Sequence, residues 1–118
     1  MTTAYVFRDA AQAAGRFSLT EEGNIYTRLT NPNNSSFEEK IAALEGGTAA
    51  ISTASGMATI SYAVLAVTRP GDEIVSADNL YGGTYELFHH TLPGLGRTVR
   101  FVSSGSLAEL KEAITEKT

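Results

Sequence analysis

Short apolar runs alternate with helix-patterned segments along most of the chain. Apolar and β-branched residues cluster in three runs that predict strands, at 48–54, 73–77 and 98–102. Each run is followed by a segment suited to a helix, at 56–67, 82–92 and 106–115. Strands that alternate with helices are typical of right-handed crossovers on a parallel sheet. The expected fold class is therefore α/β.

Two further helices are predicted upstream of these runs. Asp9 is suited to cap an alanine-rich helix that closes near Gly15. Residues 21–36 are rich in glycine, asparagine and proline, so we expect an irregular surface segment there. The next helix should end at Gly46 and Gly47.

The cap of that second helix has two candidates. Ser36 and Glu39 have the spacing of a capping box, whereas Asn33 would cap the helix one turn earlier. Apolar positions give this helix and the last one a buried face: Phe37, Ile41 and Leu44 in the first case, and Leu107, Leu110 and Ile114 in the second.

Composition narrows the class of protein. The 118 residues, 42% of them hydrophobic and 19% charged, suit one globular domain. A net charge of -4 with scattered basic residues argues against a nucleic-acid partner. The absence of cysteine excludes disulfides and thiolate sites. No signal peptide or long apolar run is visible, so we expect no membrane partner and a cytoplasmic location.

The sequence "STASGM" places small residues where a predicted strand passes into a helix. The first amides of a helix have no partner within it, and an anion such as phosphate binds them where no bulky side chain intervenes. The amides of Gly56 and Met57 are therefore candidate phosphate donors. The alternative is a tight turn whose glycine serves packing alone, and this single motif by itself favours the alternative.

The sequence "DNLYGGTYELF" follows the next strand and should lie at the same edge of the sheet. Tyr81 could stack there on a planar ligand and offer its hydroxyl to a polar group. The alternative is a half-buried core tyrosine.

The sequence "GNIYTRLTNP" contains a third pair of candidates. Tyr26 and Arg28 alternate with their neighbours, so in an extended segment both would project to one side. A guanidinium and a phenol together suit a phosphate dianion. A solvated arginine beside a packing tyrosine is an equally good interpretation.

Taken together, these motifs resemble one family. The stretches "GNIYTRLTNP", "FEEKIAALEGGTAAISTASGMATI", "RPGDEIVSADNLYGGTYELFHHTLP" and "GRTVRFV" are similar in order and spacing to the pyridoxal-phosphate enzymes of cysteine and methionine metabolism. The opening stretch "YVFRDAAQAAGRFSLTEEGNIYTR" is most similar to the O-acetylhomoserine sulfhydrylase branch. The resemblance implies part of the large domain of a fold type I enzyme, with pyridoxal phosphate as cofactor.

The resemblance also implies roles for the candidate residues. The amides of Gly56 and Met57 would hold the cofactor phosphate. Tyr81 would stack on the pyridine ring and assist proton transfer or leaving-group departure. Tyr26 and Arg28 would reach the phosphate site of a neighbouring subunit, so a homo-oligomer is expected. Residues 1–35 would then form an N-terminal arm, and residues 36–118 the first part of the cofactor-binding domain.

Two departures from the family pattern stand out. Asn33 occupies a position where the family has threonine, and asparagine still suits a helix cap. The family's cofactor-bonding lysine would lie beyond residue 118, as would its aspartate at the pyridine nitrogen and its substrate-binding arginine. Lys40, Lys111 and Lys117 all fall in predicted helices or at the chain end. We therefore expect a fragment that is inactive alone and that self-associates through uncovered strand edges.

The reaction implied for the parent enzyme is replacement at the γ-carbon of an activated homoserine, with sulfide or a thiol displacing acetate from O-acetylhomoserine. A γ-lyase or γ-synthase of the same family is the alternative. Rivals of another class are a non-catalytic module that binds a phosphorylated ligand or a partner chain, and a truncated product without function. No metal is expected, because His89 and His90 diverge on a helix and no carboxylate cluster accompanies them.

Overall fold

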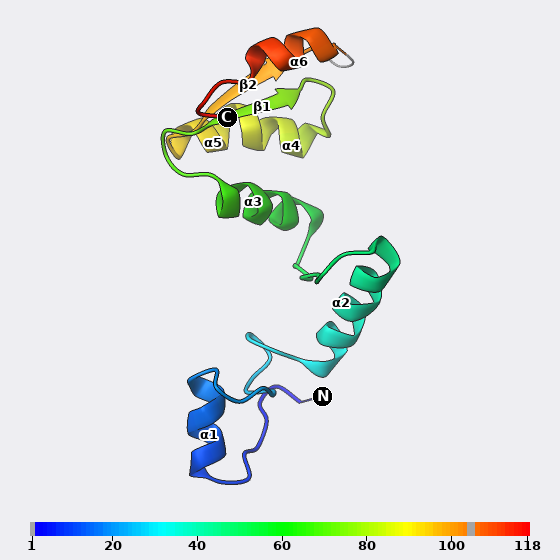
Figure 1. The fold of residues 1–118 in the computed structure, drawn as a ribbon, viewed down its shortest axis with the longest axis vertical. Coiled ribbons are helices and arrows are strands. Elements are labelled where there is room, and N and C mark those ends of the chain that lie inside the picture. Colours follow the sequence, from blue (N-terminus) through cyan, green and yellow to red (C-terminus); the bar gives the residue numbers. More distant parts are fainter. Residues whose placement is uncertain (1, 104–105) are drawn as a thin grey trace. The chain divides into compact units, whose positions relative to one another are not determined.

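The computed structural model describes residues 2–103 and 106–118. The chain forms two compact units, Met1–Ser52 and Thr53–Thr118, whose elements Figure 1 labels in chain order. The first unit contains the helices α1 (Ala10–Phe17) and α2 (Pro32–Glu45). The second contains all the strands assigned in the described part of the chain.

The start of α1 confirms the predicted cap. The Asp9 carboxylate accepts the Gln12 N–H at 2.8 Å, and the helix runs to Phe17, two residues past the expected end at Gly15. The chain then turns back, because the Gly15 carbonyl accepts the N–H groups of Thr20 and Glu21. Leu19 adopts a φ of 59° in this turn, a conformation that non-glycine residues rarely take.

The start of α2 corrects the sequence interpretation. Neither Ser36 nor Asn33 is the cap: the Asn31 side chain accepts the Asn33 N–H at 3.0 Å, and Pro32 is the first helical residue. Residues 32–36, expected to be irregular, are therefore helical. Proline suits the first helical position because that position needs no N–H and its φ is already helical. The predicted end is confirmed, since Gly46 takes a left-handed conformation with a φ of 66°.

The buried strand predicted at 48–54 is wrong. These residues have no regular structure, and the Ile51 side chain is 84% exposed. A strand exists only where a neighbour completes its hydrogen-bond ladder. Here the Ser52 N–H instead donates to the Glu38 carboxylate of α2 at 2.7 Å.

The second unit is built on a parallel pair of strands. β1 (Glu73–Ala77) pairs with β2 (Thr98–Val102) in a register that sets Glu73 opposite Thr98 and Ala77 opposite Val102. The parallel α/β arrangement is confirmed, with two of the three expected strands present among the described residues. The connection between them is helical over three consecutive segments: α4 (Gly82–Glu86), the π-helical turn η1 (Leu87–Thr91) and α5 (Leu92–Gly94).

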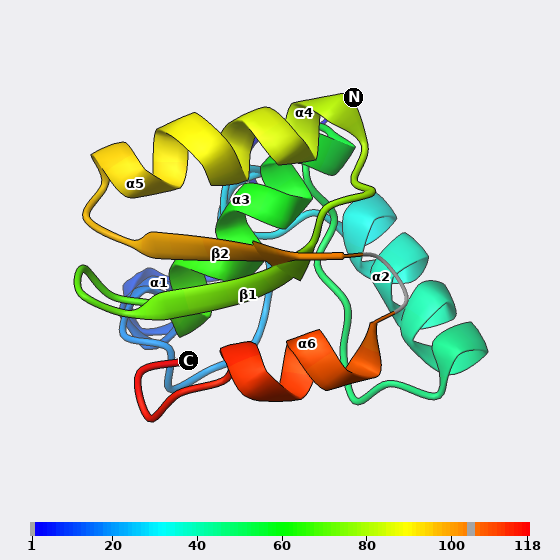
Figure 2. The same cartoon turned by 90° about the horizontal axis from the view of Figure 1, so that it is seen from above.

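Helices lie on both faces of this sheet. Figures 1 and 2 show the α4–α5 stretch on one face and α6 (Leu107–Ala113) on the other. The helix α3 (Gly56–Val67), which has the predicted bounds, contacts α4. Buried side chains gather where these helices meet the strands, and Leu92 is fully buried.

Two helix predictions need adjustment. The helix expected at 82–92 widens into a π turn, in which the Leu92 N–H donates to the Leu87 carbonyl. Pro93 explains the widening, because it has no N–H and its ring would crowd the carbonyl of His89. α6 ends at Ala113, so Ile114 lies beyond it, and Leu107 is 62% exposed rather than buried.

Candidate functional site

A pocket of about 500 Å³ lies where α3 and α4 begin. It is lined by Ser55, Gly56, Met57, Ile60, Tyr81 and Thr84. Because both helices follow extended segments and start at this pocket, the sequence-predicted residues Gly56, Met57 and Tyr81 come together here, all within the unit Thr53–Thr118.

The tip of α3 presents free backbone donors. The Ser55 hydroxyl caps the helix by accepting the Ala58 N–H at 3.1 Å. The N–H groups of Gly56 and Met57 have no hydrogen-bond partner in the described part of the chain. A Cβ added at Gly56 would meet no atom within 4 Å, so the tip is open to a ligand. Free amides together with the positive end of the helix dipole favour an anion.

Tyr81 stands at the opening of the same pocket. It directly precedes α4, and its carbonyl accepts the N–H groups of Thr84 and Tyr85, each at 2.9 Å. Its backbone is therefore fixed by the helix start. The side chain is 76% exposed, which excludes the interpretation of a half-buried core tyrosine. A ring held at its base and free on its faces is available to stack on a planar group.

Sequence reasoning missed the roles of two residues at the helix starts. Thr84 is only 7% exposed, and its hydroxyl donates to the Met57 sulfur at 3.8 Å. Ser55 was noted for its small size, whereas its hydroxyl is the α3 cap. Serine directly before a helical pattern is the signal that could have identified the cap. The contact between Thr84 and Met57 has no sequence signal, because the two residues are 27 positions apart.

Tyr26 and Arg28 belong to the other unit, Met1–Ser52. Tyr26 forms an isolated antiparallel bridge with Ala4, and its carbonyl accepts the Leu29 N–H at 2.9 Å. The expected extended segment is therefore a turn. The turn still brings the pair together, since the Arg28 guanidinium lies 5.7 Å from the centre of the Tyr26 ring. Arg28 is exposed and forms no ion pair within the residues that the structure describes.

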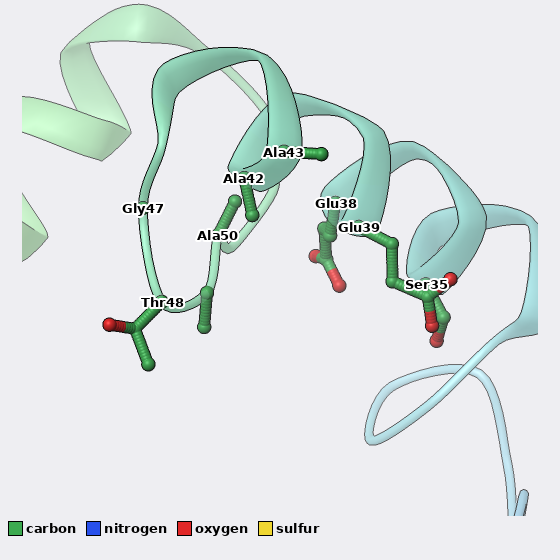
Figure 3. Close-up of a pocket in the computed structure, with 9 residues that line it drawn as sticks. Ser35, Glu38, Glu39, Ala42, Ala43, Gly47, Thr48 and Ala50 are labelled. Carbon is green, nitrogen blue, oxygen red and sulfur yellow. The ribbon is translucent and has the colours of Figure 1, made fainter.

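A second pocket, of about 490 Å³, adjoins α2 (Figure 3). Alanine side chains and the 47–50 loop form much of its lining, and Glu38 and Glu39 contribute two carboxylates. The Ser52 N–H, followed by the Ser52 hydroxyl, lowers the pKa of Glu38 below its usual value of 4.5, so this group is ionised at neutral pH. Two carboxylates make the pocket unsuited to a phosphate.

The remaining titratable groups lie outside the α3–α4 pocket. None of the three lysines, Lys40, Lys111 and Lys117, belongs to its lining. Among residues 2–103 and 106–118, no group of three or more histidine, cysteine, aspartate or glutamate side chains is arranged to hold a metal. No helix in the same residues is long and apolar enough to cross a membrane.

Comparisons with known proteins agree on one family. The model of the Cys/Met metabolism PLP-dependent enzymes matches residues 1–118. The O-acetyl-L-homoserine sulfhydrylase of Leptospira meyeri is 49% identical over 117 residues, which are 99% of this chain and 26% of that protein. The homocysteine synthase of Schizosaccharomyces pombe is 48% identical, with 99% and 27% covered. The chain thus spans about a quarter of the length of these curated relatives.

A solved structure shows the same fold. It is that of a Campylobacter jejuni protein assigned as an O-acetylhomoserine (thiol)-lyase, and it contains a pyridoxyl-lysine phosphate group. The TM-score is 0.91 at 40% sequence identity, with 99% of this chain and 29% of that chain covered. The likeness therefore extends over nearly the whole backbone of this chain.

Proposed function

Because the chain belongs to the family of Cys/Met metabolism PLP-dependent enzymes, we propose that its α3–α4 pocket is half of a pyridoxal-phosphate site. The amides of Gly56 and Met57 bind the phosphate, and the Tyr81 ring covers the pyridine. The single observation that supports this best is that an open helix tip and an exposed aromatic ring line one pocket.

The residues present fit the cofactor in charge and in shape. No carboxylate lines the pocket, so nothing there repels a phosphate dianion. Ile60 and Met57 give the lining an apolar part against which an aromatic ring can pack. When bound, pyridoxal phosphate supplies electron withdrawal from the amino-acid substrate, while the protein supplies orientation and electrostatics. The Tyr81 hydroxyl is exposed at the pocket and would hold a proton for transfer near the substrate.

We extend the proposal to Tyr26 and Arg28. Residues 1–35 serve as an arm that brings this pair to the phosphate of a neighbouring subunit in a homo-oligomer, while residues 36–118 begin the cofactor-binding domain. The exposed guanidinium of Arg28 supports the proposal, because it forms no ion pair with any described residue and can bind an oxyanion.

The reaction that we propose for the whole enzyme is γ-replacement, in which sulfide or a thiol displaces acetate from O-acetylhomoserine. The two relatives, a sulfhydrylase and a homocysteine synthase, support this choice. Binding of the cofactor phosphate at the start of α3 is the part of this function that can be tested on the 118-residue chain by itself.

Two substitutions at Gly56 test the phosphate site. Gly56→Pro deletes one N–H donor, and proline is favoured at this first helical position after an extended residue such as Ser55, with φ -162° and ψ 160°. Gly56→Ala retains the N–H and adds a Cβ that meets nothing within 4 Å. We expect Gly56→Pro to weaken binding of inorganic phosphate and of pyridoxal phosphate by about tenfold or more, as for a lost hydrogen bond to a charged group.

Amide chemical-shift titration measures both affinities. Gly56→Ala should bind within about threefold of the parent chain, since its donors are intact. Equal affinities of the proline and alanine variants would contradict the phosphate site. Borohydride reduction after loading provides a second check: we expect no stoichiometric adduct on Lys40, Lys111 or Lys117, because none of these residues lines the pocket.

A further inference from the structure

At the start of α4, the missing side chain of Gly83 leaves space for the side chains of two other residues, Tyr81 and Met57. A Cβ built on Gly83 would lie 3.0 Å from Tyr81 Cε1 and 3.1 Å from Met57 Sδ. Both distances are shorter than ordinary van der Waals contact between such atoms. The edge of the Tyr81 ring and the Met57 thioether therefore flank the space that a side chain at position 83 would fill.

Gly82, its neighbour in the same helix, differs in this respect. A Cβ on Gly82 would meet no atom within 4 Å. Both glycines lie in the first turn of α4, and neither has a positive φ. Alanine at either position thus changes helix propensity in the same direction. Only alanine at position 83 reaches the pocket side chains.

The sulfur beside Gly83 has a hydrogen-bond partner at the start of α4. Met57 belongs to the first turn of α3, and the buried Thr84 donates its hydroxyl to Met57 Sδ at 3.8 Å. The Tyr81 ring, in contrast, is 76% exposed, so few other side chains hold it in place. A methyl group at position 83 would therefore displace the ring rather than the thioether.

We propose that Gly83 is a positioning residue, whose bare Cα lets the Tyr81 ring pack beside the Met57 thioether and so sets the orientation in which the ring covers the cofactor. This inference rests on the proposed pyridoxal-phosphate site. Gly83 itself is not among the residues that line the pocket, and it acts through Tyr81.

The test compares Gly83→Ala with Gly82→Ala in the full chain. The first readout needs no ligand: the aromatic proton shifts of Tyr81 and its nuclear Overhauser contacts with the Met57 side chain. We expect Gly83→Ala to shift the ring signals and weaken these contacts, and Gly82→Ala to leave both unchanged. The amide shifts of β1 and β2 verify that each variant is folded.

The second readout separates the ring from the phosphate. Inorganic phosphate uses only the α3 amides, whereas pyridoxal phosphate also uses the ring. Gly83→Ala should weaken binding of pyridoxal phosphate by about three- to tenfold, the size of an aromatic contact, without changing the affinity for inorganic phosphate. Gly82→Ala should change neither affinity.

A third comparison uses a Met57→Ala background, in which the thioether beside the ring is absent and the Tyr81 ring can move away from an alanine at position 83. The ring signals of Met57→Ala/Gly83→Ala should therefore differ less from those of Met57→Ala than the signals of Gly83→Ala differ from those of the parent chain. If Gly83→Ala alone does not fold, we expect the double variant to recover the fold. An equal disturbance in both backgrounds, or a double variant that also fails to fold, would overturn the role given to Met57.

Unchanged ring signals in Gly83→Ala, or the same changes in Gly82→Ala, would overturn the proposal. A negative result for Gly83 can be distinguished from the absence of the proposed pyridoxal-phosphate site. If the parent chain binds neither phosphate nor pyridoxal phosphate, the cofactor site fails, while the ligand-free ring signals still decide whether Gly83 positions Tyr81.

Discussion

Five of the six buried side chains in the described residues lie in Thr53–Thr118, whereas Met1–Ser52 contributes only Ile25. The second unit packs helices against a parallel pair of strands and buries Leu92 completely. The first unit has no such layer among its described residues, and several of its large apolar side chains, Val6 and Leu44 among them, are more than 80% exposed.

Local hydrogen bonds take the place of a core in the first unit. Side-chain oxygens of Asp9, Asn31 and Glu38 each accept a backbone N–H at a helix start or in a loop. A helix cap such as Asn31 typically adds about 1 kcal/mol, while a fully buried leucine adds several times that amount. The two units are therefore stabilised by different interactions: local hydrogen bonds in the first and burial of apolar side chains in the second. The candidate cofactor pocket lies in the unit that has a core.

The largest expected effect is the loss of that core. Leu92→Ala removes a fully buried side chain between the helical crossover and the sheet, and should destabilise Thr53–Thr118 by about 2–5 kcal/mol. Leu95→Ala, at a side chain that is 47% exposed, is the matched control and should cost less than about 1 kcal/mol. Urea denaturation, followed by amide exchange of β1 and β2, measures both. A similar loss for the two variants would show that burial does not distinguish them.

A smaller effect is expected at the α2 cap in the first unit. Asn31→Ala removes the acceptor of the Asn33 N–H and should cost about 1 kcal/mol of helix stability. Ser36→Ala should be neutral or slightly stabilising, since Ser36 lies inside the helix and alanine has the higher helix propensity. Amide exchange along α2 measures both changes. A larger loss of helix stability in Ser36→Ala than in Asn31→Ala would identify Ser36 as the cap and contradict the dependence of this unit on Asn31.

The two units also differ in how far their structure was predictable from sequence. In Thr53–Thr118 the bounds of α3, β1 and β2 agree with the prediction, because apolar periodicity reports directly on packing against a sheet. In Met1–Ser52 the α2 start was misplaced, because Asn31, Asn33 and Ser36 are all good caps and only the three-dimensional structure selects one.

Predictions of the site divide differently, between helix starts and side-chain contacts that both lie in Thr53–Thr118. The starts of α3 at Gly56 and of α4 after Tyr81 were predictable from helix signals in the sequence, and both lie at one pocket. Of the two helices, only α4 follows a strand in the described part of the chain. The contact of Thr84 with Met57 was not predictable, because side chains 27 residues apart meet only through the packing of α3 on α4. The prediction of a strand at 48–54 was wrong for a related reason, because apolar composition does not reveal whether a partner strand is present.

The smallest effect concerns pH and belongs to the first unit alone. The Ser52 N–H, and then its hydroxyl, donate to the Glu38 carboxylate and lower its pKa below the usual 4.5. A lowered pKa in the folded state means that ionised Glu38 stabilises the 48–52 segment above pH 4.5. This contribution is lost as the pH falls below 4.5 through the folded-state pKa.

Glu38→Gln should therefore remove the acid-dependent change in the Ser52 amide shift, and should already show faster Ser52 exchange at neutral pH. Glu39→Gln is the matched control: it alters the neighbouring carboxylate on α2, for which no bond to Ser52 exists among the described residues, and should leave the titration in place. Amide shifts of β1 and β2 should not follow the same titration, because their order depends on apolar burial. A shared midpoint in both units would show that they respond to acid as one body and would remove the distinction between them.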